Sequence, residues 1–259
     1  MSREKSLRTE GIVLRRTDFG EADRLLTLYT RDYGKIKALA KGARKPNSRK
    51  TGHVELFMRT EFMIATGRDI GVVTQAELVE NYPALRDDLV RTTYAAYAVE
   101  LLDKFTADED KNPALYALLQ EGLGWMNEGD NLLLAARYYE LRLLSLVGYQ
   151  PQLFYCVFSN EPIEQEEQFF SAEMGGLLRP QYHKEDRRSR AISASAVKVL
   201  RYLQTHAWEG VRPLQLRRDL HTELEQVLHY YITFLLERHL KSVDFLHRLR
   251  REANLFDHE

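Results

Sequence analysis

Cysteine is nearly absent from this sequence of 259 residues, which contains only Cys156. A single cysteine excludes a disulfide framework within the chain and any zinc site built from its cysteines alone. No apolar run approaches the roughly 20 residues that a membrane-spanning helix needs, and the N-terminus lacks an apolar signal core. The sequence therefore predicts a cytoplasmic protein without membrane association, metal or cofactor.

Motifs for catalysis are also missing. The sequence contains no GxxxxGK[ST], GxGxxG, HExxH or GxSxG pattern, so nucleotide hydrolysis, dinucleotide binding, zinc proteolysis and serine hydrolysis are not indicated. The eight histidines are scattered, and His221 and His229, two helical turns apart, are more typical of a helix surface than of a metal site. We expect a binding protein, not an enzyme.

Charge is unevenly distributed, although 37 basic and 38 acidic residues nearly cancel. Residues 1–80 hold 16 Lys and Arg against 11 Asp and Glu, so the rest of the chain is acidic. Within residues 31–50, eight basic residues face one acidic residue, Asp32. A charge concentration of this kind is typical of a surface that binds a polyanion.

Hydrophobic periodicity divides the chain into two predicted domains, at residues 1–82 and 83–259. The first has a period of two, clearest from Val54 to Ile64, and turn residues separate its strands. We expect a five-stranded OB-fold β-barrel, a fold that presents one face to oligonucleotides. Further strands are expected at 7–16, 24–30, 35–41 and 72–82.

After residue 82 the period changes to that of an α-helix. The pattern predicts an all-α helical domain, so that the whole chain is α+β and multidomain. The stretch 131–147 is apolar on nearly every side, which indicates a buried central helix. An irregular insertion is expected at about 149–190, and the segment 239–251 has a basic amphipathic pattern. Other helices are expected at about 112–126, 193–205 and 213–237.

The basic segment is the strongest chemical signal. Along the expected strand 35–41, the lysines share one face and the apolar residues the other, and a basic loop that we expect to be flexible follows. This pattern suits a site that follows a nucleic-acid backbone. The predicted DNA-binding residues are Arg24, Lys35, Lys37, Lys41, Arg44, Lys45, Arg49 and Lys50. Four nearby aromatics could stack on bases or belong to the core: Phe19, Tyr29, Tyr33 and Phe57.

Several motifs in a fixed order resemble those of the bacterial RecO family, over most of the chain. The most specific is Ala40-Lys41-Gly42-Ala43-Arg44-Lys45. Others are Gly20-Glu21-Ala-Asp-Arg-Leu-Leu, Tyr33-Gly34-Lys35, Leu146-Val-Gly148-Tyr149-Gln-Pro151 and Gly175-Gly176-Leu-Leu. The resemblance implies an OB barrel followed by a helical domain, in agreement with the periodicity.

The resemblance further implies a mediator of DNA repair and homologous recombination. Such a protein binds single- and double-stranded DNA and anneals complementary strands. With RecR it helps to load RecA onto strands coated by single-stranded-DNA-binding protein (SSB). A nucleoid-associated location follows. The helical domain would dock the acidic C-terminal tail of SSB, for which the candidate residues are Arg137, Arg142, Arg187 and Arg188, although each is equally consistent with an ordinary surface charge.

One departure from the family lies in the insertion. Many relatives carry a four-cysteine zinc module there, as two CxxC pairs. This chain has Cys156 and Ser159 at the first apparent pair, and Arg179 and Tyr182 at the second. Because zinc needs four good ligands in a structural site, we expect no metal and a Cys156 that packs as a small core residue.

Three alternatives stay open. An OB-fold RNA-binding protein would share the barrel and the basic loop. A helix-turn-helix regulator is suggested by the segment 213–223, although the apolar stripe after it favours a core helix. A nuclease would need a metal-carboxylate cluster that the sequence does not show.

Overall fold

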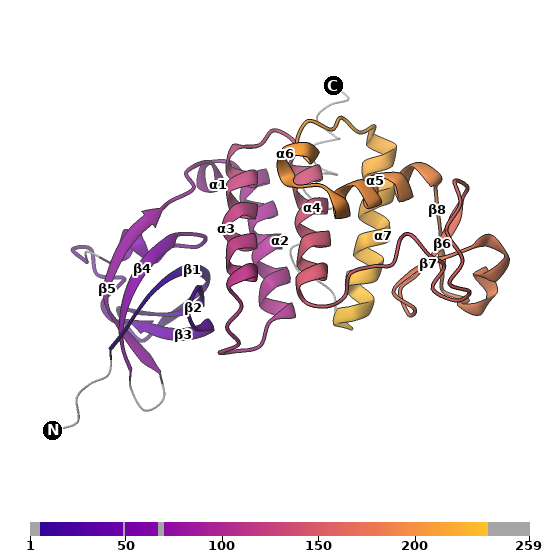
Figure 1. The fold of residues 1–259 in the computed structure, drawn as a ribbon. Helices are drawn as coiled ribbons and strands as arrows, with labels where there is room; N and C mark the ends of the chain where they lie inside the picture. The colour runs from indigo at the N-terminus through magenta and orange to yellow at the C-terminus, as the bar shows by residue number, and fades with distance from the viewer. Residues whose placement is uncertain (1–5, 49, 67–69, 238–259) are drawn as a thin grey trace. The chain divides into compact units, whose positions relative to one another are not determined.

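The computed structural model describes residues 6–48, 50–66 and 70–237 (Figure 1). The described residues up to Glu128 form one compact unit, and those from Gly129 onward form a second. The barrel and the helices α1 to α3 belong to the first unit, so the expected domain boundary at residue 82 stays a prediction.

Five strands close into a barrel in the order β1-β2-β3-β5-β4. All neighbouring strands are antiparallel except β3 and β5, which are parallel. This closed barrel confirms the predicted OB architecture. Its strands are β1 (Ser6–Phe19), β2 (Asp23–Thr30), β3 (Gly34–Ala40), β4 (Arg59–Ala65) and β5 (Gly71–Glu80).

The barrel interior is filled by alternate residues of each strand, as the period of two predicted. Its buried members include Val13, Leu26, Leu28, Ala38, Ala40, Phe62, Ile64 and Val73. The expected strand at 54–64 is wrong in its first half, because β4 begins only at Arg59. Phe57 has a φ of +69°, and Val54 and Met58 are buried from a turn that follows the short 3-10 helix η1 (Thr51–His53).

Helices α1 (Ala84–Asp87), α2 (Leu89–Phe105) and α3 (Pro113–Glu128) follow the barrel. The carboxylate of Asp88 caps α2 by accepting hydrogen bonds from the backbone N–H groups of Val90 and Arg91. Helices α2 and α3 pack against each other. After Phe105 the chain leaves α2, and its next residues lie against the barrel strand β3.

The second unit contains α4 (Leu132–Leu146), α5 (Ala194–Thr205), α6 (Trp208–Val211) and α7 (Arg218–Leu236), of which α4, α5 and α7 pack on one another. Every residue from Leu134 to Leu141 is buried, which confirms the predicted central helix. Helix α7 begins at Arg218, later than expected, and its stripe of Leu224, Val227 and Tyr231 is buried in the core.

The insertion is more regular than expected, because it contains a three-stranded antiparallel sheet in the order β7-β6-β8. Its strands are only three or four residues long, too short to produce a readable alternation. The elements are β6 (Gln168–Ser171), β7 (Gly176–Leu178), the 3-10 helix η2 (Pro180–Glu185) and β8 (Arg190–Ile192). The basic segment expected at 239–251 lies outside the described residues.

Candidate nucleic-acid interface

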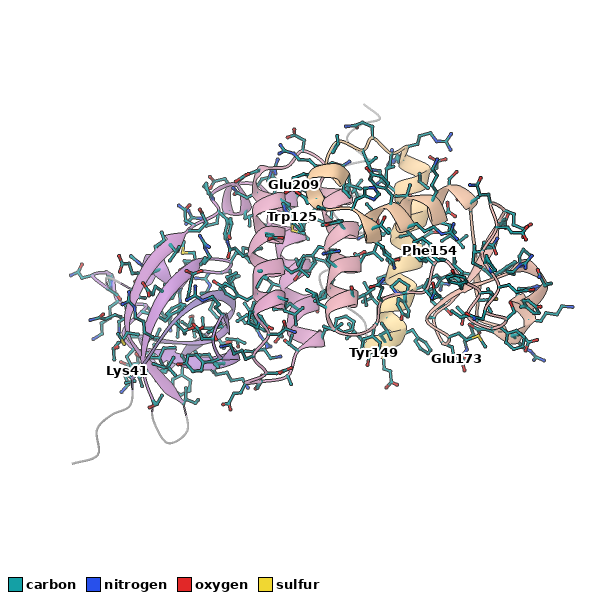
Figure 2. All side chains as sticks on the ribbon, viewed as in Figure 1. Lys41, Trp125, Tyr149, Phe154, Glu173 and Glu209 are labelled. Carbon is teal, nitrogen blue, oxygen red and sulfur yellow. The ribbon has the colours of Figure 1, made fainter. Side chains whose placement is uncertain are left out.

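The outer face of β3 carries the lysines that the sequence singled out. Ala38 and Ala40 are fully buried in the barrel, so the alternation of the strand directs Lys37 outward. Lys41 follows directly after the strand, is exposed, and appears at the lower end of the barrel in Figure 2. The predicted alternation of β3 is therefore confirmed for its apolar face and for Lys37, whereas Lys35, on the same face as Lys37, is buried.

The basic loop after β3 is a series of turns attached to the β1–β2 hairpin. Gly42 has a φ of +67°, which favours glycine, and its N–H donates to Asp23 Oδ1 at 2.8 Å. The N–H of Arg44 donates to the carbonyl of Ala22 at 2.9 Å. The Thr51 hydroxyl closes the loop by donating to the carbonyl of Ala43 at 2.7 Å. The sequence predicted a flexible loop, but these bonds fix the backbone of the loop against the barrel. The basic side chains of the loop therefore start from defined positions.

Four of the predicted DNA-binding residues lie exposed on this surface: Lys37, Lys41, Arg44 and Lys45. We call them the β3-loop cations. Among the described residues, no carboxylate lies within 4 Å of the ammonium groups of Lys41 and Lys45. Lys37 and Arg44 each form one exposed ion pair, with Asp108 at 3.3 Å and Asp18 at 3.4 Å. Exposed pairs of this kind contribute little to stability, so these cations remain accessible to a phosphate.

Three other predicted contacts are used inside the protein. Arg24, with 15% of its side chain exposed, donates to Glu55 at 2.6 Å. Lys50 donates to the carbonyl of Val73 at 2.7 Å. Lys35 is 7% exposed, and its ammonium is surrounded by acceptors from α2 and the loop after it. The eighth residue, Arg49, lies outside the described residues.

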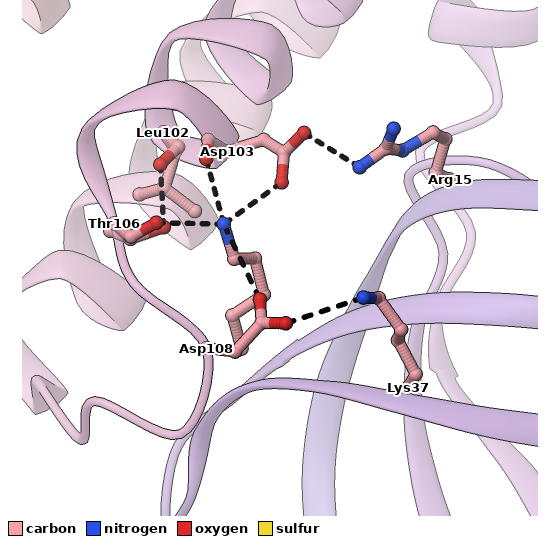
Figure 3. A network of polar contacts seen from close by, with 7 residues as sticks. Arg15, Lys37, Leu102, Asp103, Thr106 and Asp108 are labelled. Carbon is pink, nitrogen blue, oxygen red and sulfur yellow. Dashed lines mark hydrogen bonds and ion pairs between the residues drawn. The ribbon is translucent and has the colours of Figure 1, made fainter. Parts of the chain in front are cut away.

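The surroundings of Lys35 correct the expectation that it contacts DNA. Its ammonium donates to the Asp103 carboxylate at 3.1 Å and to the carbonyls of Asp103 and Thr106 at 2.8 and 2.7 Å (Figure 3). These three bonds use all three donors of a lysine ammonium. Arg15 also reaches Asp103, at 2.9 Å. Lys35 therefore attaches the end of α2 to the barrel.

Carboxylates that balance the basic face were missed by the sequence reasoning. Asp18 contacts Arg24 and Arg44, Glu55 contacts Arg16 and Arg24, and Asp103 contacts Arg15 and Lys35. Asp103 lies near the end of α2 and Asp108 lies in the loop after it, about 70 residues from β3 in sequence. Counting charges along a short segment cannot detect such partners, and the accessible charge is accordingly smaller than the segment suggested.

The structure separates the four candidate aromatics. Tyr29 and Phe57 are buried, at 0% and 4% exposure. Phe19, at the end of β1, is 55% exposed, and Tyr33, between β2 and β3, is 41% exposed. Only an exposed ring can stack on a base, so Phe19 and Tyr33 remain candidates.

Of the four arginines predicted to dock a partner, one is buried and three are exposed. Arg137 is 4% exposed and its guanidinium lies 2.6 Å from the Glu140 carboxylate and 3.7 Å from Glu225. This burial corrects the expectation for Arg137, which belongs to the core of the second unit. Arg142 is exposed and lies over the ring of Tyr138, while Arg187 and Arg188 are exposed next to η2.

The four positions that resemble a zinc module supply one thiol, that of Cys156. The guanidinium of Arg179 donates to Glu161 at 3.1 Å and to Glu164 at 2.9 Å, and the Ser159 hydroxyl donates to Glu161 at 2.9 Å. Burial raises the pKa of the Cys156 thiol, but hydrogen bonds from Ser159 and from backbone N–H groups outweigh burial and lower the pKa overall. At the other three positions, the cation of Arg179 and the neutral hydroxyls of Ser159 and Tyr182 stand where thiolates would be needed.

The described part of the chain shows neither a metal-binding cluster nor a membrane span. Within residues 6–48, 50–66 and 70–237, no three His, Cys, Asp or Glu side chains are grouped so that they could hold a metal ion. No helix among these residues is long and apolar enough to cross a bilayer.

Comparison with known proteins identifies similar chains over nearly the whole length. The family model described as Recombination protein O N terminal matches residues 1–82, and that described as Recombination protein O C terminal matches residues 86–244. The DNA repair protein RecO of Roseiflexus sp. is 39% identical over 249 residues, 96% of this chain and 88% of that protein. The DNA repair protein RecO of Desulforamulus reducens is 37% identical over 245 residues, 95% of each chain.

Proposed function

Because the chain belongs to the RecO family of DNA repair proteins, we propose that it is a recombination mediator that binds DNA through the β3-loop cations. It binds single- and double-stranded DNA, anneals complementary strands and, with RecR, helps to load RecA onto SSB-coated single strands. The observation that carries the proposal is the fixed, exposed group Lys37, Lys41, Arg44 and Lys45 on the barrel. This role needs binding and release, and it needs no catalytic group.

The chemistry of annealing fits such a surface. Two complementary strands repel each other through their phosphates, and lysine and arginine side chains lower that repulsion by displacing counterions. Contacts to the backbone leave the base edges free to pair. A protein with this role works where the DNA is, so we also propose a cytoplasmic, nucleoid-associated location.

The test is an annealing assay on two complementary oligonucleotides coated with the cognate SSB, at several salt concentrations. The test variant changes Lys37, Lys41, Arg44 and Lys45 to Ala. The matched control removes the same amount of charge elsewhere, with Lys104, Lys184, Lys198 and Arg212, all exposed, changed to Ala. We expect salt-sensitive acceleration by the wild-type protein and the control, and little acceleration by the test variant.

Other outcomes point elsewhere. If both variants anneal like the wild type, the DNA site does not lie on the β3-loop cations. If the protein accelerates nothing at any salt and prefers RNA to single-stranded DNA, the alternative of an OB-fold RNA-binding protein is favoured over the mediator.

For the protein partners, we propose that the second unit docks the acidic tail of SSB. Arg142, Arg187 and Arg188 are exposed, and no ion pair of their guanidinium groups is found among the described residues. The test measures the binding of a labelled SSB tail peptide to the variants Arg142→Ala and Arg187→Ala/Arg188→Ala. Arg218→Ala, an exposed arginine at the start of α7, is the control. Unchanged binding in the test variants would place the tail elsewhere.

A further inference from the structure

The barrel has an incomplete seam along the first half of β3. Among the described residues, strands β3 and β5 pair only at Ala38–Gly71 and Leu39–Val72, so no described residue of β5 pairs with the beginning of β3. The chain that follows α2 takes this place. Asp108 forms a parallel bridge with Lys35, and the N–H of Glu109 donates to the carbonyl of Lys35 at 2.8 Å.

The fit between this chain and β3 is close. Gly34 has a φ of +65°, and a Cβ atom built on it would lie 2.1 Å from the carbonyl oxygen of Asp110. No other residue type fits there without a shift of the backbone. We call residues 107–110 the acidic seam segment, because it carries Asp108, Glu109 and Asp110 along the edge of the most basic strand.

The carboxylate of Asp108 lies between two lysine side chains. Its two oxygens are 3.3 Å from the ammonium of Lys37 and 3.7 Å from that of Lys35 (Figure 3). The ammonium of Lys35 donates no hydrogen bond to Asp108, because its bonds to Asp103 and Thr106 already use all three of its donors. For Lys37, Asp108 is the one acidic partner among the described residues.

The pair of Asp108 and Lys37 is open to solvent. About half of each side chain is exposed, 55% for Asp108 and 51% for Lys37. The two lysines and Asp108 also line a surface cavity of about 410 Å³ together with Glu109 and apolar residues such as Ile36 and Ile64. An anion arriving from solvent therefore meets Lys37 with a carboxylate already beside it.

We propose that Lys37 forms a phosphate subsite and that the Asp108 carboxylate occupies it in the free protein as a stand-in for a DNA phosphodiester. This inference rests on the proposed function and adds a competitor to it. The backbone bonds of the acidic seam segment keep Asp108 near Lys37 when a phosphate displaces it. Each released phosphate is thus replaced at once, which weakens binding and speeds the release of a strand.

The experiment measures the affinity for a fluorescent single-stranded oligonucleotide of 30 thymidines by anisotropy, at several salt concentrations. The variant is Asp108→Asn, and the matched control is Glu109→Gln. Both remove one negative charge from the acidic seam segment, but no ion pair of Glu109 is found among the described residues. Asp108→Asn in a Lys37→Ala background tests whether Lys37 transmits the effect.

We expect Asp108→Asn to bind about two- to five-fold more tightly, which is the range of an exposed ion pair. The slope of the logarithm of its binding constant against the logarithm of the salt concentration should steepen by about 0.7, the value for one added phosphate contact on a single strand. Glu109→Gln should have a clearly smaller effect, and Asp108→Asn should have none in the Lys37→Ala background. Melting temperatures should be unchanged, because Lys35 keeps its three acceptors.

Equal gains for Asp108→Asn and Glu109→Gln would show only a change in net charge and would overturn the proposal. A gain that persists without Lys37 would overturn it as well. Failure of this inference is separable from failure of the proposed function. If the variant lacking all four β3-loop cations binds DNA like the wild type, the DNA site itself is misplaced; if that variant loses binding while Asp108→Asn gains nothing, only the competition is refuted.

Discussion

Lys35 of β3 and Asp103 of α2 form an ion pair in which 8% and 16% of the two side chains are exposed, with 3.1 Å between Nζ and Oδ1. Lys37, two residues further on the same strand, is half exposed and faces solvent. Two lysines on one strand face therefore have different roles, because the end of α2 covers only the first. This difference separates a residue that supports the fold from one that is available to DNA.

We predict that Lys35→Met destabilises the protein without directly changing DNA binding. Removing one member of a buried pair leaves the other charge poorly compensated. Here Asp103 keeps Arg15, so we expect a loss of about 2–4 kcal/mol in the free energy of unfolding. Urea unfolding measures this loss of stability. The DNA affinity of the folded variant should stay within about two-fold of wild type.

Lys37→Ala is the comparison, and it should show the opposite pattern. Its exposed ion pair is worth at most about 1 kcal/mol of stability, whereas the loss of a phosphate contact lowers DNA affinity and the salt dependence. A Lys35→Met protein that is fully stable but binds DNA weakly would show that Lys35 contacts DNA after all.

The sequence predicted the barrel because half-buried strands force a period of two, as in Phe62 and Ile64 of β4. It failed at residues 54–58, where Phe57 has a positive φ and apolar residues are buried from a turn instead of a strand. The basic residues of the candidate site could be picked out from the sequence, because they lie close together along the chain. Their carboxylate partners were not, since Asp103 and Asp108 reach β3 only through the fold.

We predict that stability falls at alkaline pH because of two buried tyrosines. Burial raises the pKa of Tyr29 and of Tyr82 to about 12, above the value near 10 of an unfolded chain. Between these values the unfolded state loses the phenol proton while the folded state keeps it, so unfolding becomes easier as pH rises. The expected slope is about 1.4 kcal/mol per pH unit for each tyrosine, with no contribution below about pH 9.

The measurement is the urea midpoint between pH 9 and pH 11.5. Tyr29→Phe is the matched variant, because the Tyr29 hydroxyl has no hydrogen-bond partner among the described residues. At neutral pH this change should cost little, and above pH 10 it should reduce the slope by the share of one tyrosine. A slope unaffected by Tyr29→Phe would mean that Tyr29 does not resist ionisation.

We predict that the insertion folds without metal. Arg179 and its partners Glu161 and Glu164 join the two positions that CxxC pairs would link through zinc. EDTA should therefore leave the melting temperature unchanged, and purified protein should contain no stoichiometric zinc. Arg179→Met should lower the free energy of unfolding by about 1–2 kcal/mol, since 18% of the arginine side chain is exposed. A melting temperature that falls with EDTA would refute a metal-free insertion.

The last prediction concerns Phe19, which is 55% exposed at the end of β1, next to the hairpin that anchors the basic loop. If a base stacks on this ring, Phe19→Ala should weaken single-strand binding by about 1–3 kcal/mol. Duplex binding should change little, because paired bases are already stacked on one another. The exposure of the ring means that stability should hardly change.

Phe19→Trp sharpens this prediction, because a larger ring retains stacking and its fluorescence reports contact with a base. Phe19→Leu is the matched control, which keeps an apolar side chain but removes the π-face. Stacking predicts that the Trp variant binds as tightly as wild type and is quenched by single strands, whereas the Leu variant binds as weakly as Ala. Equal binding by all four proteins would exclude stacking on Phe19 and would leave Tyr33 as the remaining candidate for stacking, beside the phosphate contacts of Lys37, Lys41, Arg44 and Lys45.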